Sequence, residues 1–242
     1  MSERPERSGV YPWYDSVWLG EYARAKATIA AARPERLEAF VAAFEVFRTA
    51  RSFREQRLAH VFGDDTMAEI RRAVKSLRPT DLELHEGRAF GRFVVHDHPL
   101  FAALQEQLVP LMSETVGEPV ESAYSFLSLY GARGVCPPHL DSPQAKWTLD
   151  LCIDQSAPWP IHVSQVCAWP EPAADAALDG EWHYRDPIPR SPGRTFAELL
   201  FFHFIPAGTA ALLPPDTWPI RFGVPELRSA RRTAGVASPA AG

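Results

Sequence analysis

Two residues that could bind a metal, His139 and Asp141, stand two positions apart just before a strand-like run, Trp147–Ile153. In a strand, residues i and i+2 point to the same side, so both side chains could converge on one point. A neutral imidazole and a carboxylate are two of the three ligands of the facial triad, which binds Fe(II) and leaves positions open. The alternative is that Asp141 makes a turn with Ser142–Pro143 and that His139 lies in a loop.

The elements that must position this pair differ between the two halves of the chain. Of the 23 prolines, seven precede residue 137 and sixteen lie from Pro137 onward, so helices are expected mainly in the first half. Apolar residues at helical spacing predict three helices, and an earlier one is expected over residues 14–32. These stripes run over residues 37–47, 67–77 and 101–111, the last behind Asp97 or His98 as the N-cap.

Strands are predicted by aromatic and β-branched content and fall mainly in the second half. Many short strands behind a helical layer predict an α+β fold, a β-sandwich or barrel braced by N-terminal helices. We expect a helical region over residues 1–87, a strand-rich core over 88–220 and a flexible tail over 221–242. The expected strands are residues 88–95, 122–130, 147–153, 159–163, 182–185, 199–205 and 209–213.

Composition excludes several classes of protein. The chain has 242 residues, 46% of them hydrophobic, which is enough for one sizeable core. A net charge of −5 gives no electrostatic footprint for nucleic acid, and no apolar run is suited to a membrane. The three cysteines form no CxxC pair, and the N-terminus has no signal-peptide pattern, so we expect a cytoplasmic protein with reduced thiols.

The order of several motifs resembles one known family. HDHP (96–99), YSFLSLYGARGVCPPHLD (124–141), a Trp-Pro-Ile strand and PAGTAALL (206–213) follow one another. In this order they resemble the prolyl-hydroxylase-like branch of the Fe(II)/2-oxoglutarate-dependent oxygenases, over about residues 91–213. The resemblance implies a double-stranded β-helix, a jelly-roll or cupin-like barrel, that binds Fe(II) and 2-oxoglutarate.

The resemblance also assigns roles to individual residues. His139 and Asp141 match the first two iron ligands, Tyr130 matches a tyrosine that hydrogen-bonds the 2-oxo acid, and Thr148 lies on the strand behind the metal. The distal histidine of the family, expected near residues 218–221, is missing, because no histidine follows His203. Three histidines remain as candidates for the third ligand: His203, His162 and His183. His203 is the one we assign, and we expect His183 in or near a loop.

Two functions follow from this pattern. The first is a 2-oxoglutarate-dependent dioxygenase that hydroxylates a small molecule or a peptidyl side chain. The retained His139 and Asp141 favour it, although the sequence identifies no other catalytic residue. The second is a catalytically impaired β-helix domain that acts as a ligand-binding protein, which the missing distal histidine favours. Neither nucleic acid nor membrane is expected as a partner, and the sequence leaves the oligomeric state open.

Overall fold

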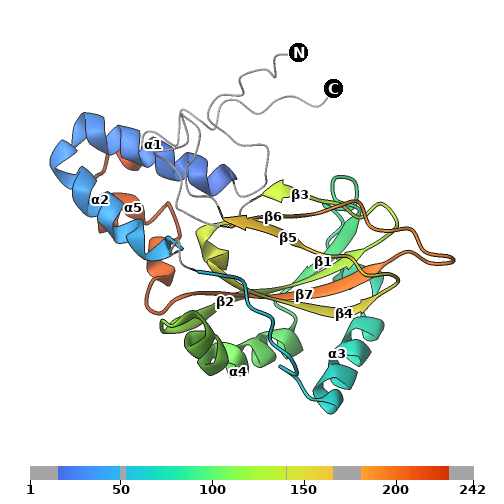
Figure 1. Ribbon diagram of the computed structural model, residues 1–242. Helices are drawn as coiled ribbons and strands as arrows, with labels where there is room; N and C mark the ends of the chain where they lie inside the picture. The colour runs from blue at the N-terminus through green and yellow to red at the C-terminus, as the bar shows by residue number, and fades with distance from the viewer. Residues whose placement is uncertain (1–15, 50–52, 140, 166–180, 229–242) are drawn as a thin grey trace, which may run out of the picture.

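The computed structural model describes residues 16–49, 53–139, 141–165 and 181–228, which form an α+β structure (Figure 1). The helices are α1 (Ser16–Ala32), α2 (Leu37–Phe44), α3 (Asp64–Ser76), α4 (Pro99–Val116) and the short α5 (Trp218–Arg221). The strands are β1 (Arg92–His96), β2 (Val120–Tyr130), β3 (Cys136–His139), β4 (Trp147–Gln155), β5 (His162–Gln165), β6 (Glu181–Arg185) and β7 (Ala197–Pro206).

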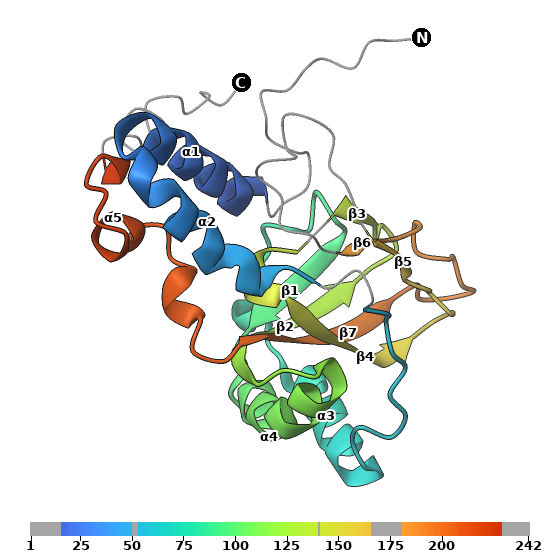
Figure 2. The same cartoon turned by 60° about the vertical axis from the view of Figure 1, so that its left-hand side comes forward.

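The strands form two antiparallel sheets. The larger has the order β1-β2-β7-β4 and the smaller the order β3-β6-β5. The smaller sheet lies over one face of the larger, while α3 and α4 cover the opposite face (Figures 1 and 2). The predicted α+β class is therefore confirmed. The described residues form no closed barrel, and the double-stranded β-helix stays a prediction.

The outer face of the larger sheet holds the main hydrophobic core. Alternate residues of β7 point to this face, and Leu200, Phe202 and Phe204 are fully buried there. They pack with apolar residues of α3 and α4, which recur at helical spacing as the sequence predicts. The remaining alternate residues of β7 face the smaller sheet, so β7 is buried on both sides.

A buried glutamine of α4 reaches through to the backbone of this sheet. Gln105 is 2% exposed, and its Nε2 donates to the carbonyl oxygens of Tyr124 (3.1 Å) and His203 (2.6 Å). The β2–β7 register shifts between Ser122 and Tyr124, where a bulge interrupts the regular ladder. The side-chain amide therefore satisfies carbonyl groups at the place where the strand pairing is irregular.

The N-terminal helices α1 and α2 pack against the C-terminal segment as well as against the strand-rich core. Trp18 and Phe40 of α1 and α2 share a second buried cluster with Trp218, Val224 and Leu227. The boundary expected at residue 221 falls inside this packed segment, and residues 229–242 lie outside the described part. No helix among the described residues is both long enough and apolar enough to cross a membrane.

Most predicted elements are present, with shifted ends, but one strand is not. Residues 209–213 were expected to form a strand, whereas residues Ala210–Leu212 form a 3-10 turn. The reason is local: Gly208 adopts a positive φ of 78°, and the Thr209 hydroxyl donates to the carbonyl of Pro206 (2.6 Å), which folds the chain back. The segment then leads to α5.

The packing of Trp218 predicts a large loss of stability on truncation. Trp218 is 2% exposed, its Nε1 donates to the Leu212 carbonyl (2.7 Å), and its ring contacts Trp18, Phe40 and Phe44. We expect Trp218→Ala to lower the free energy of unfolding by about 3–5 kcal/mol, measured by chemical denaturation. Ile220→Ala, two residues away but 75% exposed, should change it by no more than about 0.5 kcal/mol. Equal losses in the two variants would contradict this account.

Candidate metal centre

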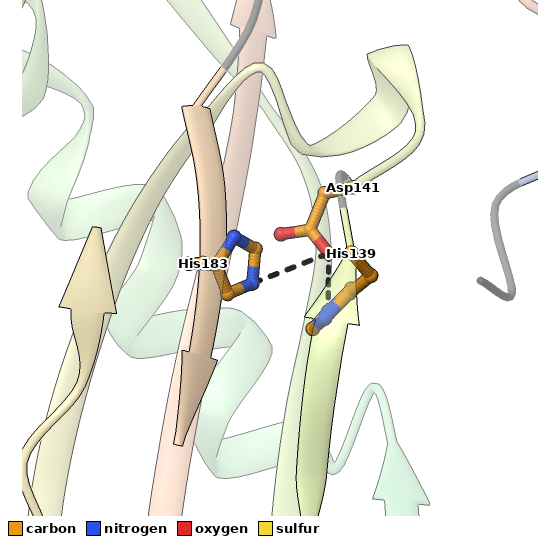
Figure 3. A group of neighbouring side chains, drawn as sticks. All are labelled: His139, Asp141 and His183. Carbon is orange, nitrogen blue, oxygen red and sulfur yellow. Dashed lines mark ion pairs between the residues drawn. The ribbon is translucent and has the colours of Figure 1, made fainter. Parts of the chain in front are cut away.

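Three side chains that can ligate a metal meet on the smaller sheet: His139, Asp141 and His183 (Figure 3). Their ligand atoms all lie within 4.8 Å of one another. Asp141 Oδ1 is 3.5 Å from His139 Nε2 and 3.9 Å from His183 Nε2, so the carboxylate lies between the two rings. In the described residues this is the one group of three such side chains close enough to hold an ion.

Antiparallel pairing explains why residues so far apart in sequence meet here. His139 of β3 is the direct partner of His183 of β6, and the two ring centroids are 4.2 Å apart. Side chains of directly paired residues lie on the same face of a sheet. The register shifts between Cys136 and His139, so the ligand pair sits just beyond an irregularity in the ladder. Asp141 follows β3 by two positions and completes the group.

The backbone orients His139 for metal binding. His139 is 8% exposed, and its Nδ1 lies 2.8 Å from the carbonyl oxygen of Pro137. A carbonyl only accepts a hydrogen bond, so Nδ1 carries the proton and donates it. In the neutral ring this places the lone pair on Nε2, the atom nearest Asp141. Such a backbone contact is the usual way in which a protein fixes the tautomer of a ligating histidine.

Without a metal, the Asp141 carboxylate makes ion-pair contacts with His139 and His183. Burial alone would lower the pKa of His139, but hydrogen bonds to Asp141 and Cys136 outweigh it and raise this pKa to about 10. Burial alone would likewise raise the pKa of Asp141, but the charges of His183 and His139 hold it well below its ordinary value. The proton on His139 therefore supplies the positive charge beside Asp141 that a bound metal ion would otherwise supply.

The spacing of the ligand atoms suits a divalent metal. Metal–nitrogen and metal–oxygen bonds are about 2.0–2.2 Å long. Ligand atoms at right angles around one ion are then about 3 Å apart. The separations of 3.5 and 3.9 Å are longer than this, and the three ligand atoms all lie within 4.8 Å of one another, so a small inward shift would bring them around one ion. Two imidazoles and one carboxylate on one side of an ion leave the other side open, so the donor set fits the facial triad.

The larger sheet presents a row of polar residues toward this group. Tyr124, His203 and Thr148 are paired across β2, β7 and β4. They face the smaller sheet, because Asp150, two residues after Thr148, forms an ion pair with Arg185, two residues after His183. The charge of Asp141 also acts on the pKa of His203.

His203, the residue assigned as third ligand from the sequence, is not in the three-residue group. Its Nδ1 is hydrogen-bonded to Thr148 Oγ1 (2.9 Å), and its ring packs on Tyr124, with centroids 4.3 Å apart. Burial lowers the pKa of His203 to about 4, so the ring is neutral near pH 7. The structure thus brings His183, and not His203, to the pair. It also places His183 within β6, which confirms the predicted strand at residues 182–185, and not in a loop.

The two residues assigned to the cosubstrate lie far apart. Thr148 belongs to the row with Tyr124, whereas Tyr130 is six residues further along β2, which corresponds to about 20 Å. Tyr130 is 4% exposed, its hydroxyl accepts a hydrogen bond from Arg92 (2.7 Å), and its ring packs on Trp159. One small ligand therefore does not contact both Thr148 and Tyr130 in this arrangement.

Comparison with protein-family models and with curated proteins finds no match to this chain. The site is thus argued from its own geometry. Sequence reasoning named His183 among the three candidates but assigned His203, because His183 was expected in or near a loop. The available signal was the alternation in residues 181–185, which placed His183 and Arg185 on one face of an expected strand.

The raised pKa of His139 predicts opposite pH effects on stability and on metal binding. The folded pKa of about 10 exceeds the unfolded value of about 6.5. The stabilisation by the His139–Asp141 pair is thus complete below pH 6.5 and is lost as pH rises toward 10. Co(II) must displace the same proton, so its affinity should increase about tenfold per pH unit between pH 7 and 9.

Thermal unfolding in EDTA and titration with Co(II), followed by absorption, measure the two effects. His139→Gln is the matched variant, since it keeps a polar side chain of similar size but removes the titrating group. It should flatten the dependence of stability on pH over this range. A Co(II) affinity of the wild type that does not change between pH 7 and 9 would contradict the assignment of His139 as a protonated ligand.

Proposed function

We propose that the protein is a cytoplasmic, Fe(II)- and 2-oxoglutarate-dependent oxygenase that hydroxylates a small molecule or a peptidyl side chain. The observation that carries the proposal is the group formed by His139, Asp141 and His183, whose ligand atoms lie within 4.8 Å of one another. Two histidines and one carboxylate with open positions are the ligand set of non-haem Fe(II) oxygenases.

The residues around the group have roles that follow from their contacts. Pro137 fixes the His139 tautomer through its carbonyl oxygen, and the smaller sheet holds His139 and His183 side by side. Tyr124, His203 and Thr148 line the facing sheet, where they would contact a substrate at the open side of the ion. A bound Fe(II) would supply the oxygen chemistry, which amino-acid side chains do not provide.

The 2-oxoglutarate part of the proposal rests on the resemblance of the sequence. Two arginines are buried among the described residues, Arg185 of β6 and Arg92 of β1. Each already pairs with a carboxylate, Asp150 and Glu86 respectively. A ligand with two carboxylates would therefore compete with one of these pairs for a guanidinium group. The ligands of the metal centre fit Fe(II), whereas no residue is assigned to bind the second carboxylate of 2-oxoglutarate.

The alternative, an impaired domain that only binds a ligand, was favoured by the missing distal histidine. His183 answers that argument, because it offers a candidate third ligand, earlier in the chain than expected. An active metal centre is therefore the better supported of the two functions. The two remain distinguishable by turnover, since only the oxygenase consumes its cosubstrate.

Metal titration of single variants tests the ligand set. His139→Ala, Asp141→Ala and His183→Ala should each abolish tight binding of Fe(II) under anaerobic conditions, or of Co(II) in air, because each removes one of three ligands. His203→Ala is the matched control from the facing sheet, and should change the affinity no more than about tenfold. If His203→Ala abolishes binding while His183→Ala retains it, the ligand set proposed here is wrong.

Turnover tests the oxygenase itself. Anaerobic Fe(II) protein is titrated with 2-oxoglutarate, air is admitted, and succinate is measured. We expect a metal-to-ligand absorption band and oxygen-dependent succinate above the level of the His183→Ala variant. Tight metal binding without either signal would reject the oxygenase and leave a metal-binding protein.

A further inference from the structure

An ion pair that crosses between the two sheets lies directly beside the proposed metal ligands. Arg185 follows His183 by two residues on β6, so both side chains point to the larger sheet. The Arg185 guanidinium donates from one terminal nitrogen to Asp150 of β4 and from the other to the carbonyl oxygen of Trp159. It also lies 5.3 Å from the centroid of the Trp159 ring.

These contacts hold β6 where its pairing with β3 is irregular. β6 pairs with β3 through Cys136–Arg185 and His139–His183, and the register shifts between these two pairs. The β6 strand has only five residues, and two of them carry the contacts that matter here. The backbone ladder alone thus defines the position of His183 relative to His139 less firmly than in a regular pair.

The pair lies partly buried between the two sheets, with the Asp150 side chain 24% exposed. Arg185 is 9% exposed. Asp150 is paired with Phe201 of β7, the strand that is covered on both faces. The Arg185 guanidinium donates hydrogen bonds in two directions, to the Asp150 side chain on β4 and to the Trp159 backbone in the loop that follows β4. Its planar guanidinium fixes direction in a way that a lysine ammonium does not.

We propose that Arg185 is a positioning residue for the metal centre: by tying β6 to β4 through Asp150, it sets the distance of His183 from His139 and Asp141. The inference rests on the proposed metal centre and not on the identity of the cosubstrate. Asp150 and Arg185 then influence the geometry of the metal site without binding the metal themselves.

A second buried ion pair provides the control. Arg92 of β1 pairs with Glu86, and both side chains are 8% exposed, as is that of Arg185. Neither residue lies on β3 or β6. Breaking this pair should destabilise the fold as breaking the Arg185–Asp150 pair does, but it removes no charge from β6 or from Asp150.

Co(II) is the probe, because its visible absorption bands report both affinity and ligand geometry. We expect Asp150→Asn to weaken Co(II) binding about 10–100-fold and to shift the absorption bands, as for loss of a residue that orients a ligand. Glu86→Gln should leave both unchanged. Arg185→Lys keeps the charge but loses the bidirectional contact, so it should fall between the wild type and Asp150→Asn. Melting temperatures in EDTA measure the loss of fold stability separately.

The outcomes separate this inference from the proposed function. If Asp150→Asn and Arg185→Lys bind Co(II) with wild-type affinity and spectrum, Arg185 is not a positioning residue, although the oxygenase can stand. If Glu86→Gln weakens Co(II) binding as much as Asp150→Asn, the effect is one of general stability and the inference is overturned. If the wild type binds no Co(II) at all, the metal centre and this inference both fail.

Discussion

Strand β7 is buried on both faces, and the arrangement of the molecule depends on this constraint. Its outward residues, Leu200, Phe202 and Phe204, lie under α3 and α4, and β2 and β4 flank it in the sheet. A strand buried on both faces has a strongly defined register, because a slip by one residue would exchange its two sets of side chains. β7 therefore fixes which residues of β2 and β4 face the smaller sheet.

The smaller sheet is positioned more weakly, and the candidate metal centre lies on it. Its strands have four or five described residues, and its pairing is irregular beside the ligands. One link between the smaller sheet and the larger is an ion pair, Arg185–Asp150. A polar link between two sheets is directional, whereas apolar packing is not. A metal centre needs this direction, since ligand atoms must approach a common point closely.

Local patterns in the sequence predicted much of the fold, and long-range pairing accounts for what they did not predict. Apolar spacing located α2, α3 and α4, and strand composition located β2, β4 and β7, because these signals depend on neighbouring residues. His139 and Asp141 were recognisable for the same reason. His183 was not, because its proximity to His139 arises from the pairing of β3 with β6, across 44 residues (183 − 139). No local pattern distinguishes the histidine that meets the pair from one, such as His203, that faces it.

The amide of Gln105 links the two faces of the larger sheet. Gln105 belongs to α4, on the face of the sheet away from the candidate metal centre. Its side chain nevertheless donates to the backbone carbonyl groups of Tyr124 and His203, two residues whose side chains face that centre. A hydrophobic residue at this position would suit the surrounding core by composition alone. It would remove the hydrogen bonds that these two carbonyl groups accept from Gln105, at the place where the strand pairing is irregular. The residue at position 105 of α4 is thus restricted by the backbone of residues whose side chains lie on the opposite face of the sheet.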